Sequence, residues 1–204
     1  MNYIKEPHTA LFVAQTGIGK TYKALNLIET EYKNHFDYII IICPTLKYNK
    51  TYRDKKWIWE DPGVILIEPE NKLYEWIKCM SDLISGFDGL PKTLFLIDDI
   101  IADEKLDKKR QPLLELAISG RHRNQSLWIL TQSYTAIPKN IRRQSKMLYV
   151  WYPKNKKDLQ NIYEENDVIE TTEELNNIKN ELKGGKHTCL IIRMEYPRMY
   201  KICS

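Results

Sequence analysis

The segment AQTGIGKT at residues 14–21 has two glycines among the three residues that precede a lysine and a threonine. Gly17 and Gly19 permit backbone conformations that a Cβ would block, so successive N–H groups can point inward at anionic oxygens. A helix that opens at Lys20 adds its free N–H groups and the positive end of its dipole. Lys20 can then bind the β- and γ-phosphates, and the Thr21 hydroxyl can ligate Mg²⁺. The stretch therefore predicts a loop that binds a polyphosphate.

This loop departs from the GxxxxGK[ST] pattern at one position, because Ala14 stands where the first glycine is expected. Alanine is still small, and the two inner glycines are present. A glycine turn with no ligand is the alternative, but strand, loop, Lys-Thr and helix follow one another in the required order. The residues expected to line the nucleotide phosphates are Ala14, Gln15, Thr16, Gly17, Ile18, Gly19, Lys20 and Thr21.

A second source of chemistry is the segment TLFLIDD at 93–99, an apolar strand that ends in two carboxylates. Next to a phosphate loop, the first acid, Asp98, is expected to hold Mg²⁺ through water. The second acid, Asp99, is then placed to orient or deprotonate the attacking water. The alternative is an Asp pair that caps the following turn. Two further strand candidates lie between the loop and Asp98, an order typical of ATPases that use a catalytic carboxylate.

A third segment, SGRHRNQSLWILTQS at 119–133, puts a polar loop with arginines before an apolar strand that ends in glutamine. Gln132 can hydrogen-bond the γ-phosphate or the attacking water and so sense the nucleotide state. Arg121 or Arg123 could reach the γ-phosphate of a neighbouring subunit as an arginine finger. Arg142 and Arg143 remain further candidates for that role.

Short apolar runs alternate with helix-length segments along the chain, which predicts an α/β sheet with helices on both faces. The runs are rich in Ile, Val, Leu or aromatic residues, as is typical of buried parallel strands. They span 9–14, 38–43, 64–67, 93–97, 127–131, 147–152 and 188–192. The expected helices span 20–32, 71–85, 111–119, 156–165 and 170–182, and 198–202 can add a hairpin strand. We found no repeat or linker, so one domain over 1–204 is expected.

Composition indicates a globular chain of 204 residues with 43% hydrophobic and 28% charged residues. No apolar run approaches the roughly 18 residues of a membrane span, and the N-terminus lacks a signal-peptide core, so an intracellular protein is expected. The four cysteines form no CxxC pair and the four histidines are scattered, so the sequence indicates neither a zinc site nor a disulfide framework.

Charge is unevenly distributed although the net charge is only +4. Ten basic residues and two acidic residues lie between Lys105 and Lys146. Such a stretch can neutralise nucleic-acid phosphates. It can equally be a set of solvated loops.

Two other nucleotide-binding classes match parts of the sequence. Asn155-Lys156-Lys157-Asp158 fits the NKxD pattern for guanine, but no DxxG begins at Asp98 or Asp99. The phosphate loop followed by Cys43-Pro44-Thr45 resembles the first motifs of tandem-domain helicases, which need a second domain of the same kind. A nucleotide-dependent assembly switch without DNA movement is a third possibility, although a pair such as Asp99 and Gln132 favours turnover.

Taken together, the phosphate loop, TLFLIDD, GRHRNQSLWILTQS and the segment from Ile137-Pro138 to Trp151-Tyr152-Pro153 resemble the viral genome-packaging ATPases of the FtsK and HerA superfamily. The Arg-His pair before a strand ending in Thr-Gln is the specific part. Asp99 stands where such motors usually carry glutamate. The resemblance favours Arg121 as the finger. His122 belongs to the same motif, but we expect it to orient the loop rather than to act in catalysis.

This resemblance implies a RecA-like, three-layer α/β/α phosphate-loop NTPase of the ASCE type, with a mainly parallel sheet whose core order is 5-1-4-3-2. It implies ATP and Mg²⁺ as cofactors, assembly into a pentameric or hexameric ring, and ATP-driven translocation of double-stranded DNA into a preformed capsid. The expected partners are double-stranded DNA, further copies of the chain, and capsid or portal-vertex proteins. The expected location is the host cytoplasm or the viral assembly site, or the virion.

Overall fold

The centre of the fold is an eight-stranded sheet with the order β3-β2-β4-β5-β1-β6-β7-β8. The computed structural model describes residues 2–70, 72–98 and 111–204. The strands are β1 (Thr9–Val13), β2 (Tyr38–Ile42), β3 (Val64–Ile67), β4 (Thr93–Asp98), β5 (Gln125–Thr131), β6 (Ser145–Trp151), β7 (Cys189–Arg193) and β8 (Met199–Cys203). All neighbours from β3 to β6 pair in parallel, and β7 and β8 are added as antiparallel strands.

The core order expected from the resemblance is confirmed. Numbering β1, β2, β4, β5 and β6 as 1 to 5, the adjacent strands β6-β1-β5-β4-β2 give the order 5-1-4-3-2. β3 extends this core beyond β2, and the hairpin of β7 and β8 extends it beyond β6. The strand expected at 188–192 is therefore not parallel, since β7 runs against β6. The predicted hairpin at 198–202 is present as β8.

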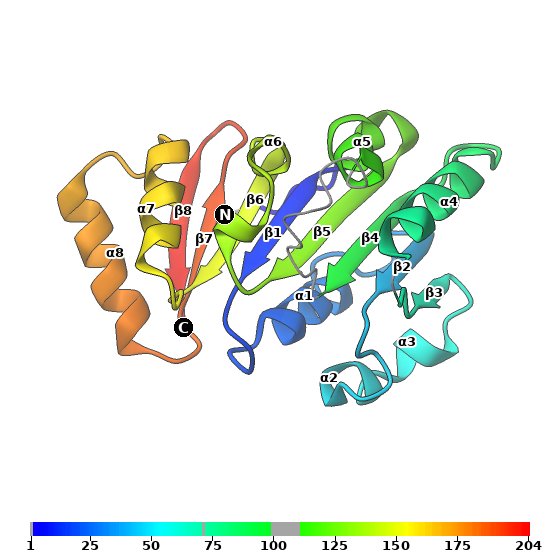
Figure 1. The fold of residues 1–204 in the computed structure, drawn as a ribbon, viewed down its shortest axis with the longest axis horizontal. Helices are drawn as coiled ribbons and strands as arrows, with labels where there is room; N and C mark the ends of the chain where they lie inside the picture. Colours follow the sequence, from blue (N-terminus) through cyan, green and yellow to red (C-terminus); the bar gives the residue numbers. More distant parts are fainter. Residues whose placement is uncertain (1, 71, 99–110) are drawn as a thin grey trace.

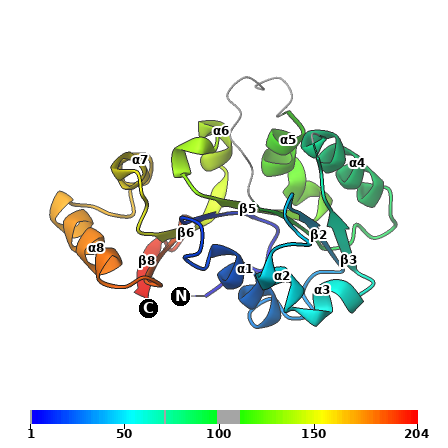
Figure 2. The ribbon, with the colours of Figure 1, turned by 60° about the horizontal axis from the view of Figure 1, so that its bottom comes forward.

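Helices cover both faces of the sheet (Figures 1 and 2). The α-helices are α1 (Lys20–Glu29), α2 (Lys50–Arg53), α3 (Lys56–Glu60), α4 (Leu73–Ser85), α5 (Gln111–Ser119), α6 (Lys139–Arg142), α7 (Lys156–Glu165) and α8 (Thr172–Gly184). The first three cover one face, and α4, α5 and α6 lie on the other face in Figure 2. Two 3-10 turns, η2 (Gly120–Arg123) and η3 (Tyr134–Ala136), flank β5.

Two hydrophobic clusters hold these layers together because β1, β4 and β5 are buried on both faces. One cluster joins β1, β4 and β5 to side chains of α4 to α8. The other joins the opposite sides of the same strands to α1, α2 and α3. Continuous apolar runs, rather than alternating ones, were therefore the correct signal for these strands.

The short helices α2, α3 and α6, which have only four or five residues each, were not predicted from the sequence. Segments of this length are too short to show a hydrophobic period of 3.6 residues. A local signal exists only for α2, where the side chain of Asn49 accepts a hydrogen bond from the backbone N–H of Thr51 as an N-cap.

The carboxyl ends of the parallel strands meet at one edge of the sheet. Val13 of β1 pairs with Thr131 of β5, and Asp98 of β4 pairs with Leu130 of β5. The residues that follow β1 and β5 therefore lie beside the end of β4, which is where a ligand binds in an open α/β sheet.

Candidate active site

The segment between β1 and α1 has the backbone of a phosphate-binding loop. Gly17 has φ +76° and Gly19 has φ +113°, both in the region that L side chains rarely adopt. Gly19 is also the N-cap residue of α1, so the helix begins at Lys20 as the sequence predicted. A Cβ added at Gly17 would meet nothing within 4 Å, so it is the positive φ, rather than lack of space, that favours glycine at this position. This geometry leaves the N–H groups of the first turn of α1 available to an anion.

Ala14 is accommodated because the backbone at this position continues the strand. Its N–H donates to the carbonyl of Thr131 over 3.0 Å, and its side chain is fully buried. Its φ is not positive, unlike the φ angles of the two inner glycines. The first glycine of the usual pattern is therefore not required here.

Lys20, Thr21 and Asp98 converge at the start of α1. The hydroxyl of Thr21 donates to Oδ2 of Asp98 over 2.8 Å, and Lys20 Nζ lies 3.8 Å from Oδ1 of the same carboxylate. All three side chains are buried, and Asp98 is only 1% exposed. The structure thus brings together the three residues that the sequence assigned to the phosphates and the metal ion. Asp99 lies outside the described residues, so its assignment stays a prediction.

Gln132 follows β5 and lies next to the phosphate loop. It lines a cavity of about 580 Å³ together with Gln15 and Thr16. A second cavity of about 520 Å³ is lined by Lys20, Thr21 and other residues of the loop and by the segment at 45–51. Gln132 therefore lies beside the phosphate loop, and its role as a sensor of the γ-phosphate stays a prediction.

Asp158 holds the segment after Gln132 in position. Its carboxylate is fully buried, and it accepts hydrogen bonds from the backbone N–H groups of Tyr134 and Thr135 and from the hydroxyls of Ser133 and Thr135, at 2.9 to 3.2 Å. Asn155 caps α7, since its side chain accepts from the N–H of Lys157. Both informative residues of the NKxD-like segment therefore have partners within the fold, which does not support guanine recognition.

Glu165, at the other end of α7, anchors the same connection. Tyr134 donates its hydroxyl to Glu165 over 3.0 Å, and Arg142 forms a bidentate ion pair with this carboxylate. Burial alone raises the pKa of Glu165, but the hydrogen bonds from Arg142 and Tyr134 outweigh it and lower the pKa. Burial also raises the pKa of the Tyr134 hydroxyl to about 12. Arg142 is thus engaged in an internal ion pair, which excludes it as a finger or a DNA contact in this conformation.

Arg121 lies far from the phosphate loop of its own chain. It belongs to η2, which precedes β5, whereas Gln132 follows β5. The seven residues of β5 separate η2 from Gln132, and an extended strand of this length spans about 20 Å. Arg121 is exposed, and the neighbouring Arg123 lies 3.8 Å from Asp82 of α4. An action of Arg121 on ATP would therefore have to be on a neighbouring subunit.

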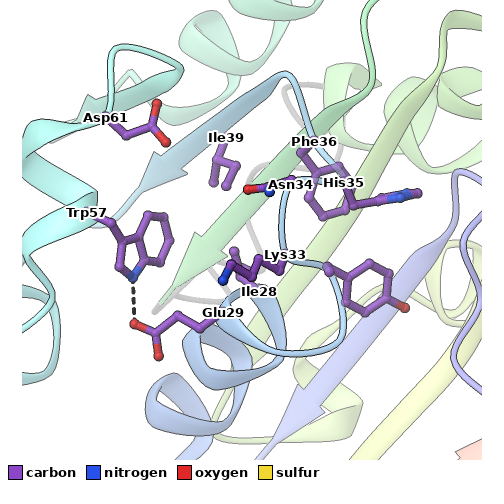
Figure 3. A pocket seen from close by; sticks show the side chains of 10 residues that line it. Ile28, Glu29, Lys33, Asn34, His35, Phe36, Ile39, Trp57 and Asp61 are labelled. Carbon is purple, nitrogen blue, oxygen red and sulfur yellow. Dashed lines mark hydrogen bonds between the residues drawn. The ribbon is translucent and has the colours of Figure 1, made fainter.

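A further cavity of about 280 Å³ lies at the opposite end of α1 (Figure 3). Aromatic side chains of Phe36 and Trp57 line it, and the Trp57 indole donates to Glu29 over 2.7 Å. Burial lowers the pKa of His35, which also lines this cavity. No residue of the phosphate loop contributes to it, so it is distinct from the nucleotide site.

Tyr52 and Asp158 are site residues that the sequence analysis missed. Tyr52, from the unpredicted helix α2, donates its hydroxyl to Asp98 over 2.8 Å. Asp158 was noted only as part of a guanine motif. Neither residue carries a sequence signal for these contacts, because both depend on how distant segments pack.

The fold and site define the class of the protein: a phosphate-loop NTPase with the strand order of the RecA-like group. The chain belongs to the Poxvirus A32 protein family, whose model matches residues 1–196. The resemblance found in the sequence is confirmed by this match. A comparison with curated protein sequences gives no significant match.

Solved structures of viral packaging enzymes share the fold. The DNA-packaging ATPase B204 from Sulfolobus Turreted Icosahedral Virus has a TM-score of 0.72 and 16% identity, with 98% of each chain covered. The genome packaging NTPase B204 from Sulfolobus turreted icosahedral virus 2 in complex with AMPPCP has a TM-score of 0.68 and 18% identity, with 99% of each chain covered. The pCW3 conjugation coupling protein TcpA, with ATPγS, has a TM-score of 0.60 and 14% identity, and the match covers 96% of this chain and 60% of TcpA.

Proposed function

We propose that this protein is an ATP-hydrolysing motor subunit that translocates double-stranded viral DNA into a preformed capsid. The observation that carries the proposal is the convergence of Lys20, Thr21 and Asp98 at the opening of α1, in a chain of the Poxvirus A32 family. The packaging role of the structurally similar B204 proteins supports the same assignment.

The site has the groups needed to hold ATP for hydrolysis. The loop N–H groups and Lys20 bind the β- and γ-phosphates, and Lys20 offsets their charge in a buried position. The Thr21 hydroxyl and the Asp98 carboxylate are hard oxygen donors, which suit Mg²⁺ when phosphates and water complete its shell. When bound, Mg²⁺ neutralises charge on the phosphates.

Asp99 and Gln132 are assigned to the attacking water. Asp99 follows the metal-holding acid directly in sequence, where a carboxylate can take a proton from water. Gln132 orients this water or contacts the γ-phosphate, and Asp158 fixes the backbone that follows it. Arg121 of a neighbouring subunit supplies the finger, which makes turnover dependent on ring assembly.

Duplex DNA is the proposed track of this motor, with further copies of the chain forming the ring. Lys139 and Arg143 are exposed residues of the connection between β5 and β6, the connection that starts at Gln132. A basic surface on this connection is suited to sequence-independent phosphate contacts. Capsid or portal-vertex proteins complete the assembly, and the motor acts in the host cytoplasm or at the viral assembly site. Among the described residues, no helix is long and apolar enough to cross a membrane.

Salt-dependent DNA binding tests the proposed track. Replacing Lys139 and Arg143 with alanine should weaken binding to any duplex to a similar extent and flatten the plot of log K against log salt by about 0.9 per lost contact. The exposed lysines Lys33 and Lys92 provide a charge-matched control pair, because Lys33 lines the cavity that contains Trp57 and the backbone N–H of Lys92 donates to Asp37 before β2. An unchanged slope in the first variant, or an equal change in the control, would assign Lys139 and Arg143 to ordinary solvated surface.

A further inference from the structure

The buried hydroxyl of Tyr52 lies at the metal side of the nucleotide site. It donates to Oδ2 of Asp98 over 2.8 Å, the same oxygen that accepts the Thr21 hydroxyl over 2.8 Å. Tyr52 comes from α2, in the connection between β2 and β3, and its side chain is fully buried. A residue outside the phosphate loop and outside β4 thus contacts the proposed metal-holding carboxylate.

Contacts of helix α2 hold this phenol in position. The Asn49 side chain caps the helix by accepting from Thr51 N–H over 3.0 Å. The Trp59 indole donates to the backbone carbonyl of Tyr52 over 3.1 Å, which ties the helix to α3. The ring of Tyr52 packs in the same hydrophobic cluster as Ile58 and the side chains of α1. Packing around the ring and the hydrogen bonds made by Asn49 and Trp59 therefore direct the Tyr52 hydroxyl at Asp98.

Two hydroxyl donors on one oxygen fix the orientation of a carboxylate. Asp98 is 1% exposed, so its charge depends on hydrogen bonds from the protein in place of water. With Oδ2 held by Thr21 and Tyr52, Oδ1 is directed toward the side of Lys20, whose Nζ lies 3.8 Å away. Partners that orient a metal-holding carboxylate in this way control metal affinity without contacting the ion.

We propose that Tyr52 is a positioning residue that fixes the Asp98 carboxylate for Mg²⁺ bound with ATP. This inference rests on the proposed nucleotide site, but it adds a contact from α2 that the phosphate-loop pattern does not contain. The same helix and its cap also border the nucleotide cavity, since Asn49 and Thr51 line it together with Lys20 and Thr21.

The variant Tyr52→Phe tests this role, because it removes one oxygen and keeps the buried ring. The matched control is Tyr32→Phe, which removes another buried tyrosine hydroxyl whose partner is the carbonyl of Ile4. Binding of a fluorescent ATP analogue is measured with Mg²⁺ and with EDTA, and binding of Mn²⁺ in the presence of the nucleotide is followed by electron paramagnetic resonance. Thermal unfolding of both variants reports the structural effect separately.

We expect Tyr52→Phe to weaken divalent-ion binding by about tenfold or more. A loss of this size is typical when a supporting contact of a metal ligand is removed. Nucleotide binding in EDTA should stay at the wild-type level, and Tyr32→Phe should keep wild-type ion affinity. Unchanged divalent-ion affinity in Tyr52→Phe overturns the inference. So does a loss of nucleotide affinity that is equal with Mg²⁺ and with EDTA. If the wild-type protein itself shows no Mg²⁺-dependent nucleotide binding, the proposed site fails and this inference fails with it.

Discussion

The hydroxyl of Thr21 and the carboxylate of Asp98 are joined by a hydrogen bond of 2.8 Å although 77 positions separate them in sequence. The first residue belongs to the opening turn of α1 and the second ends β4. Their contact joins the phosphate loop to the acidic strand and defines where a metal ion and the terminal phosphates would lie. Lys20 lies beside the same carboxylate. Single substitutions can therefore test phosphate binding, hydrolysis and subunit contact one at a time.

Lys20→Ala should abolish turnover and most nucleotide binding. Lys20 is the motif-assigned side-chain cation for the β- and γ-phosphates, and loss of one group aimed at developing charge costs about 10² to 10³ in rate. ATP hydrolysis and equilibrium binding of a fluorescent analogue measure the two effects. Lys33→Ala is the control, since Lys33 is exposed at the opposite end of α1. Wild-type nucleotide affinity in Lys20→Ala would contradict the assignment of the phosphate loop.

Asp99→Asn should separate binding from hydrolysis. The amide keeps the size of the side chain but removes its negative charge and its ability to accept a proton. A general base contributes about 10² to 10⁴ in rate, so single-turnover hydrolysis should fall by this order while ATP still binds with Mg²⁺. If binding falls as far as in Lys20→Ala, the roles of Asp98 and Asp99 have been exchanged.

Asp158→Asn should lower kcat and leave ATP affinity near the wild-type value. The amide group replaces one of the two acceptor oxygens, so one of the donors at 133–135 loses its partner or faces another donor. The displaced backbone moves Gln132, and we expect kcat to fall by about tenfold or more because a misplaced group of this kind costs up to 10².

Asn155→Ser is the control for this experiment because serine also caps a helix well and adds no charge to the cavity that Asn155 lines with Gln132. A lower melting temperature with unchanged kcat in Asp158→Asn would limit Asp158 to a scaffold role. A loss confined to GTP turnover would restore the guanine interpretation of the segment.

Arg121→Ala should reduce hydrolysis by roughly 10³ to 10⁵, the range found for arginine fingers. Since Arg121 is about 20 Å of strand away from its own phosphate loop, the effect has to cross a subunit interface. Mixing Arg121→Ala subunits with Lys20→Ala subunits should restore partial activity, because some interfaces then join an intact loop to an intact finger.

Arg123→Ala is the neighbouring control in this mixing experiment. Arg121 is excluded as the finger if mixed rings form and hydrolyse ATP only at the background rate. Normal turnover by Arg121→Ala alone would also exclude it. Loss of activity in Arg123→Ala with the same complementation behaviour would transfer the role to Arg123.

The elements that position the site were predictable because their sequence signals are local. The run before Ala14, the two glycines and the helix start at Lys20 follow from backbone sterics and helix-end chemistry. The buried runs of β4 and β5 are continuous, so their ends at Asp98 and before Gln132 could also be placed. The order of these strands required the family resemblance, since no local signal reports which strands are neighbours.

The contacts made by Tyr52, Asp158 and Arg142 could not be predicted in the same way. The partner of Tyr52 is 46 positions away and comes from a helix of only four residues. Asp158 matches a guanine motif in sequence, but its carboxylate packs against the connection after β5. Arg142 was a candidate finger in the basic stretch at 105–146, and its ion pair with Glu165 had no signal in the sequence.

ATP hydrolysis at this site is proposed to drive the movement of duplex DNA through the motor. The most direct measurement is the steady-state rate of ATP hydrolysis by the wild-type chain with Mg²⁺, with and without double-stranded DNA, and with Lys20→Ala as the blank. We expect Mg²⁺-dependent hydrolysis that duplex DNA stimulates and that Lys20→Ala abolishes. Hydrolysis that is indifferent to DNA at every protein concentration that supports ring assembly would contradict it and would indicate a nucleotide-dependent switch.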